Sequence, residues 1–184
     1  MSLTMDMLKQ EHRNMSRLLD SLDQQIYQFE QAKDVDYDLI SQIVDYFRSF
    51  PDLYHHPKED LIFQKLQDRN PVQAKTFADL DSEHEECSKR LFIFARVVVG
   101  VLIETEIPRE KFVRIARDFI DNERRHMSGE ENWFFPAAVQ YLTAEDWAEI
   151  DTRVSKLPDP LSELERETLH RYDLVQAVLS RTTD

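Results

Sequence analysis

The sequence predicts an all-α fold, a bundle of antiparallel helices followed by a C-terminal helical extension. Glycine occurs only twice in 184 residues, at Gly100 and Gly129, which is too few for the frequent tight turns of a sandwich or barrel. Apolar side chains recur at alternating steps of three and four residues, the spacing of one helix face. Prolines and capping residues divide the chain into long segments with short connections, which is typical of antiparallel neighbours in a bundle.

The expected helices cover, in chain order, residues 4–31, 36–68, 71–104 and 108–141, then a short segment from residue 143 and a last one over residues 161–179. The second helix should be kinked or split at Pro51 and Pro57, because proline lacks the N–H donor and clashes with the carbonyl one turn earlier. Asn70-Pro71 combines a helix cap with proline at the first helical position. Ile107-Pro108 opens the fourth helix.

Two units are expected along the chain. Residues 1–142 hold the four long helices, and residues 143–184 form the helical extension. Thr143-Ala-Glu-Asp resembles a capping box that starts the extension. An apolar stripe on the last helix either packs on the bundle or forms a dimer seam, so a monomer and a homodimer both stay open. The stripe consists of Leu161, Leu164, Tyr172, Val175 and Leu179.

Charge and composition exclude several classes of function. Lys and Arg total 23 against 36 Asp and Glu, a formal net charge of −13, which repels nucleic acid and anionic membrane surfaces. The longest nearly apolar run, residues 91–103, contains Arg96 and is shorter than the roughly 20 residues of a membrane span. The single cysteine, Cys87, suits a reducing compartment. With no signal peptide recognised, a cytoplasmic location is expected.

The chain contains an internal repeat of two helix pairs. The two apolar stripes carry histidine at the third place, and each residue of the second lies 72 positions after its counterpart in the first. The first stripe is Met5, Leu8, His12, Met15, Leu19, Leu22, Ile26 and Phe29, and the second is Phe77, Leu80, His84, Cys87, Leu91, Phe94, Val98 and Val101. Because such a stripe faces the core of a bundle, both histidines are expected to point inward.

Each core histidine is followed downstream by His-x-x-x-Glu, as His55 with Glu59 and as His126 with Glu130. Residues four apart share one helix face, so the imidazole and carboxylate converge. Burying four histidines and two carboxylates is costly unless a cation compensates them. A carboxylate can bridge two metal ions about 3.5–4 Å apart. The spacing therefore predicts two metals, one on each histidine pair.

The predicted pairing places His12 with His55 on one metal and His84 with His126 on the other, bridged by Glu59 and Glu130. Four further side chains leave alternatives open. His56 and Asp60 are also four residues apart and form a rival ligand pair, although His56 points some 100° away from His55 on an ideal helix. Glu11 and Glu83 lie off the ligand face, either solvated or supporting the ligands. Cys87 is expected to be buried as a small hydrophobe, the alternative being a soft ligand or redox partner.

The same residues resemble hemerythrin and the hemerythrin-like, or HHE, cation-binding domains over about residues 4–142. The matching motifs are His12, His55-His-Pro-Lys-Glu59, Glu83-His84 and His126-Met-Ser-Gly-Glu130. The resemblance implies an up-and-down antiparallel four-helix bundle that holds a non-haem di-iron centre with an oxo or hydroxo bridge. Manganese or zinc would also suit imidazole and carboxylate ligands.

The resemblance implies binding of dioxygen, or sensing of oxygen, nitric oxide or iron. One departure from the family is Ser88, which stands where oxygen-carrying hemerythrins have a further histidine. We therefore expect stable oxidation rather than reversible oxygen carriage. The alternative function is a di-iron redox enzyme, such as an oxidase, a peroxidase or an iron–sulfur repair factor, that uses the same site.

Overall fold

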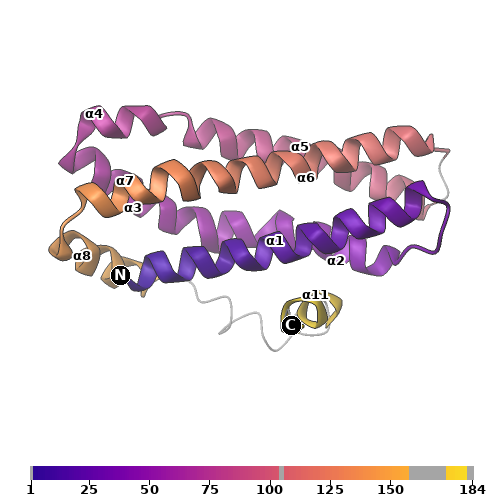
Figure 1. Ribbon diagram of the computed structural model, residues 1–184, viewed down its shortest axis with the longest axis horizontal. Helices are drawn as coiled ribbons and strands as arrows, with labels where there is room; N and C mark the ends of the chain where they lie inside the picture. The colour runs from indigo at the N-terminus through magenta and orange to yellow at the C-terminus, as the bar shows by residue number, and fades with distance from the viewer. Residues whose placement is uncertain (1, 104–105, 158–172, 182–184) are drawn as a thin grey trace.

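The computed structural model describes residues 2–103, 106–157 and 173–181, and within these ranges it contains helices and no strand (Figure 1). The predicted all-helical class is therefore confirmed for the described residues. The helices are α1 (Leu3–Glu30), α2 (Tyr37–Phe50), η1 (Pro51–His55), α3 (His56–Arg69), α4 (Pro71–Ala74), η2 (Lys75–Phe77), α5 (Leu80–Leu102), α6 (Arg109–Gly129), η3 (Glu130–Phe134), α7 (Phe135–Tyr141), α8 (Ala144–Val154) and α11 (Asp173–Ser180).

Four long helical segments lie side by side along the longest axis of the molecule (Figure 1). They are α1, then α2 continued through η1 into α3, then α5, and finally α6 continued through η3 into α7. α6 packs on both α1 and α5, and α2 packs on the same two helices. Each segment thus has a neighbour on two sides, and the four enclose the core.

Two of the long segments contain a single wide turn of π-helix, η1 and η3. The His56 N–H donates to the Pro51 carbonyl and the Phe135 N–H to the Glu130 carbonyl, in each case five residues back. A proline follows directly, Pro57 in one segment and Pro136 in the other. Since proline donates no hydrogen bond and crowds the preceding turn, the helix widens in front of it. The sequence predicted the first irregularity and missed the second.

The prediction of one unbroken helix over residues 71–104 is wrong. α4 and η2 form a short separate stretch, and α5 begins only at Leu80. The Thr76 hydroxyl donates to the Gln73 carbonyl over 2.6 Å, and such side-chain bonds compete with the regular helix pattern. The break leaves the functional part of the helix, from Leu80 onward, continuous.

Two apolar clusters fill the interior, one on each side of the histidines. One cluster joins α1, α2, α5 and α6 and includes Met15 and Leu91. The other joins α1, α3, α7 and α8 and includes Leu8 and Leu61. His12 follows Leu8 and precedes Met15 on the same stripe of α1. The polar residues therefore form a layer between two apolar cores.

The C-terminal extension contacts the long helices in two places. α8 packs on α1 and α3, and α11 packs on α1 and α2. Val175 is buried and Leu179 is partly buried against the larger cluster, whereas Leu161, Leu164 and Tyr172 lie outside the described residues. The division into units 1–142 and 143–184 stays a prediction. No described helix is long and apolar enough to cross a membrane.

Asp151 on α8 binds the first turn of α1. Its carboxylate accepts hydrogen bonds from the backbone N–H groups of Leu3 (3.3 Å) and Thr4 (3.0 Å) and from the Thr4 hydroxyl (2.6 Å). Burial opposes the carboxylate charge, but the bonds from Thr4 and Leu3 lower the pKa of Asp151 below its ordinary value. Asp151 therefore supplies a charged cap to α1, in addition to the local cap from the Ser2 hydroxyl.

We expect Asp151→Ala to lower the free energy of unfolding by about 1–3 kcal/mol at pH 7, the usual cost of losing hydrogen bonds to a charged group. Because the folded pKa is lowered, the contribution is present above the unfolded pKa and is lost as the pH falls through the folded pKa. Urea unfolding of both proteins at pH 7 and pH 3 measures this difference.

The matched control is Glu149→Ala on the same helix, since Glu149 is exposed and pairs only across the surface with Lys65. Its effect should stay below about 0.5 kcal/mol. An Asp151→Ala effect as small as the control, or one unchanged at pH 3, would contradict the assigned role.

Candidate metal centre

The six residues predicted as metal ligands meet in the polar layer, and each comes from a different element. Their ring nitrogens and carboxylate oxygens face one another, and their side chains are between 1% and 13% exposed. The residues are His12 on α1, His55 at the end of η1, Glu59 on α3, His84 on α5, His126 on α6 and Glu130 at the start of η3.

His12 and His55 form one side of the site. Their Nε2 atoms are 3.0 Å apart. Glu130 Oε2 lies 3.2 Å from His12 Nε2, and Glu59 Oε1 lies 3.2 Å from His55 Nε2. One ligand atom from each of these four residues lies within 4.8 Å of the others. Two nitrogens and two oxygens thus converge on one point.

His84 and His126 form the other side. Glu59 Oε2 lies 3.5 Å from His84 Nε2, and Glu130 Oε1 lies 3.1 Å from His126 Nε2 and 3.7 Å from His84 Nε2. Each carboxylate therefore directs one oxygen to each histidine pair. This is the arrangement that two bridging carboxylates require.

Three further carboxylates orient the imidazole rings from outside. His55 Nδ1 lies 2.8 Å from Glu11, His126 Nδ1 lies 3.1 Å from Glu83, and His12 Nδ1 lies 3.0 Å from Glu131. An ionised carboxylate only accepts hydrogen bonds, so each Nδ1 carries the proton. Nε2 is then the nitrogen of each ring that faces the site, where it binds either a proton or a cation. Such outer carboxylates commonly fix the tautomer of metal-binding histidines.

The resulting interior has more acceptors than donors. Both oxygens of Glu59 and of Glu130, together with Nε2 of His84 and of His126, are buried and make no hydrogen bond among the described residues. Nε2 of His12 and Nε2 of His55 lie 3.0 Å apart, so one proton or cation between them serves both nitrogens. Unpaired buried acceptors cost free energy. A positive charge between them removes that cost.

The carboxylates of the site also favour positive charge on the imidazole rings. Burial opposes a positive charge on His55, but Glu59 and Glu11 outweigh it and raise the pKa of His55 to about 10. Burial likewise opposes charge on His84, and Glu130 and Glu59 raise the pKa of His84 to about 10. The pKa of Glu59 is held well below its ordinary value, against the effect of burial, by His55 and His84. Protons and metal cations therefore compete for the same nitrogens.

The spacing fits metal coordination. Two ligand atoms that each lie about 2.1 Å from one metal ion are roughly 3.0–3.4 Å apart, depending on the coordination angle. The contacts of 3.0–3.2 Å on the His12 side lie within this range. Those of 3.1–3.7 Å on the His84 side begin within it and extend 0.3 Å beyond it. The imidazole and carboxylate donors suit iron, manganese and zinc alike.

Three sequence expectations need revision around this core. His56 does not point away: its ring stacks on His84, with centroids 3.7 Å apart. It pairs with Asp52 at 3.1 Å and clusters with His84 and His126, and Asp60 is exposed. Glu11 and Glu83 support the ligands instead of being merely solvated. The proline directly after His56 was the available signal, because it marks the wide turn that brings consecutive side chains inward.

Cys87 is buried, as expected. Asn122 Nδ2 lies 3.1 Å from its sulfur, and burial together with Glu123 raises the pKa of the Cys87 thiol above its ordinary value. Burial also raises the pKa of Glu123 to about 7. The sulfur is absent from both groups of clustered ligand atoms in the described ranges. A neutral buried thiol is a poor metal ligand.

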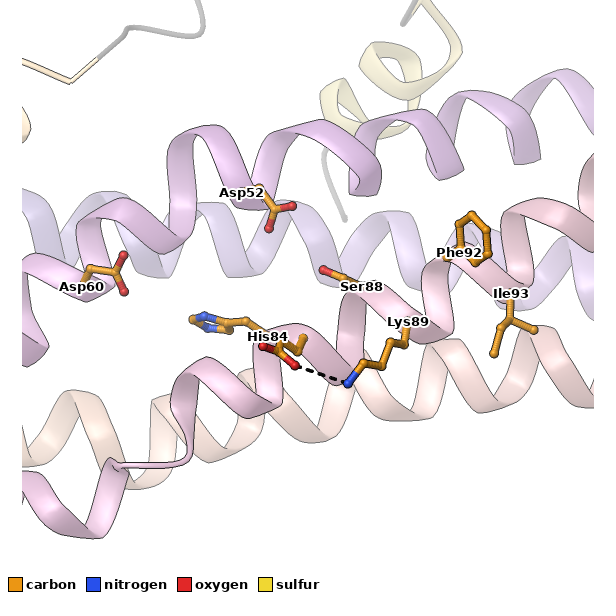
Figure 2. A pocket seen from close by; sticks show the side chains of 8 residues that line it. Asp52, Asp60, His84, Ser88, Lys89, Phe92 and Ile93 are labelled. Carbon is orange, nitrogen blue, oxygen red and sulfur yellow. Dashed lines mark hydrogen bonds and ion pairs between the residues drawn. The ribbon is translucent and has the colours of Figure 1, made fainter.

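A pocket of about 760 Å³ opens beside His84 (Figure 2). Asp52 and Asp60 line it from one helical segment, and His84, Ser88 and Phe92 line it from α5. Among the six residues, His84 is the most exposed, at 13%, whereas His12 and His55 are 1% and 2% exposed. The site is therefore accessible from the His84 side and closed by apolar packing, including Phe135 stacked on His12, on the other.

Comparison with known families identifies the chain. Residues 3–138 match the family model described as hemerythrin HHE cation binding domain. The protein belongs to this family. No curated protein and no solved structure matches the chain. The matched range contains all six clustered residues, so family membership and local geometry independently indicate cation binding.

Replacing the outer carboxylates should weaken cation binding without removing a ligand. We expect Glu11→Ala and Glu83→Ala each to lower the affinity for Zn²⁺ by about 10- to 100-fold, the usual effect of losing a carboxylate behind a ligating histidine. Competition with a fluorescent chelator measures this affinity. Glu85→Ala is the matched control, since Glu85 is exposed and pairs with Lys89. Affinities equal to that of the control would refute the orienting role.

Proposed function

We propose that this protein is an up-and-down four-helix bundle that binds two metal cations, with His12 and His55 on one, His84 and His126 on the other, and Glu59 and Glu130 bridging them. One observation carries the proposal: each buried carboxylate directs one oxygen to each histidine pair, and these oxygens have no hydrogen-bond partner in the described part of the chain. The family match supports cations as the ligand.

Iron is the proposed metal for both positions, with manganese and zinc as the alternatives that the same donors accept. A di-iron centre of this kind supplies redox activity and affinity for small diatomic molecules. The residues of the chain hold the cations, fix the imidazole tautomers through Glu11, Glu83 and Glu131, and exclude water from the His12 side. We propose binding or sensing of oxygen, nitric oxide or iron as the biological role.

A redox enzyme is the second candidate, and the pocket beside His84 favours it. A volume of about 760 Å³ exceeds what a diatomic molecule occupies and is within the range of small-molecule sites. Its walls combine the apolar Phe92 and Ile93 with the polar Asp52 and Ser88 (Figure 2). An organic substrate would reach the His84 side of the centre through this opening.

The proposed setting is the cytoplasm, with the protein acting as a monomer or homodimer and without nucleic acid or membrane partners. The net charge of −13 supports the absence of polyanionic partners. The lone cysteine, buried and unpaired, supports a reducing compartment.

The stoichiometry of metal binding tests the proposal directly. After anaerobic reconstitution with ferrous iron and removal of free metal, elemental analysis should find two iron ions per chain. Glu59→Ala and Glu130→Ala should each abolish the two-metal state, because each removes a ligand from both cations at once. The control is Asp146→Ala. Asp146 is a buried carboxylate on α8 that pairs with Arg69 and is not among the clustered ligands. Fewer than one iron per chain in the wild type would contradict the proposal.

The response to air separates the candidate roles. The reduced, iron-loaded protein is mixed with air and then sparged with argon while the visible spectrum is recorded. We expect the colour of the oxidised form to persist after sparging, because Ser88 supplies no further nitrogen ligand. Return of the colourless reduced state would instead indicate reversible oxygen carriage. Sustained turnover of peroxide at tens per second in the same sample would favour the enzyme.

A further inference from the structure

The two sides of the metal centre differ chemically in one residue that stacks on a ligand ring. On the first side the Phe135 ring stacks on His12, with centroids 5.3 Å apart and planes 25° apart. On the second side the His56 ring stacks on His84, with centroids 3.7 Å apart and planes 12° apart. Each stacking residue directly follows a wide turn and directly precedes a proline. A phenyl ring can only pack there, whereas an imidazole also brings a nitrogen lone pair.

His56 has the hydrogen-bond state of a ligand. Its Nδ1 lies 3.1 Å from Asp52 Oδ1, so Nδ1 carries the proton and Nε2 keeps its lone pair. This repeats the pattern of His55 with Glu11 and of His126 with Glu83. The nitrogens offered by His56, His84 and His126 lie within 4.8 Å of one another.

The surroundings leave room for His56 to turn toward a cation. Parallel stacked rings direct their lone pairs side by side, so binding one ion together with His84 requires a small rotation of the His56 ring. A cavity of about 20 Å³, which both His56 and Ser88 line, adjoins the ring. The short side chain at Ser88 leaves this space. On the His12 side, no described residue offers a third clustered nitrogen.

We propose that His56 is a third imidazole ligand of the cation held by His84 and His126, so that the second cation has three protein nitrogens and the first has two. The inference rests on the proposed two-cation function and extends it, because it makes the two metal positions unequal. The more accessible position is then the one with more nitrogen ligands, and the closed position keeps only His12 and His55.

Paramagnetic NMR of the cobalt-loaded wild type counts the imidazole ligands without any substitution. Each histidine bound to Co²⁺ through Nε2 keeps one exchangeable Nδ1 proton, whose signal is strongly shifted and disappears in D₂O. Five such signals are expected, from His12, His55, His56, His84 and His126. Four signals with two Co²⁺ bound would overturn the inference and leave the proposed function intact. Absence of cobalt binding would overturn both.

The variant His56→Phe tests the same point by affinity, and it reproduces the phenyl ring found at Phe135, so the stacking on His84 is kept. Chelator competition should show the affinity for the second Co²⁺ reduced by at least about tenfold and that for the first changed by less than about twofold, with one shifted signal lost from the spectrum. Asp60→Asn, which changes a residue that lines the pocket beside His84, should leave both affinities and all five signals unchanged. An unchanged second affinity in His56→Phe would overturn the inference.

Discussion

The structure depends on one electrostatic constraint: six side chains direct four imidazole nitrogens and four carboxylate oxygens at one another across a few ångströms in the interior. Nε2 atoms of His12 and His55 lie 3.0 Å apart, and four carboxylate oxygens beside them have no hydrogen-bond partner among the described residues. In an apolar interior such an arrangement is unfavourable unless positive charge compensates it. Cations, or protons in their absence, must therefore occupy this layer, and the surrounding fold determines where they bind.

Two features of the fold maintain this constraint. Apolar clusters on both sides of the layer exclude water and make the unpaired acceptors costly, which strengthens the preference for a cation. The outer carboxylates of Glu11, Glu83 and Glu131 keep the Nδ1 protons outside the site. The wide turns η1 and η3 lie inside two of the long segments, and each places a ligand within the turn and a stacking residue directly after it. Local irregularities in the helices thus serve the site.

Most of the fold and the six clustered residues could be predicted from the sequence, because both follow from helix periodicity. The three- and four-residue steps that bury Leu8 and Met15 also place His12 inward, and the four-residue spacing joins His55 with Glu59. His56 was misplaced because an ideal helix turns consecutive residues by about 100°, whereas a wide turn ahead of Pro57 does not. Glu11 and Glu83 were left undecided since the long side chain, rather than the helix position, determines whether the carboxylate reaches a ring.

The most direct test of the account is the position of bound metal. Crystals of the protein loaded with iron or zinc would be measured at the absorption edge of the metal, so that anomalous scattering locates each ion. The account predicts two peaks separated by about 3.5–4 Å, one next to His12 and His55 and the other next to His84 and His126, with Glu59 and Glu130 between them. A single peak, or peaks away from this layer, would contradict it.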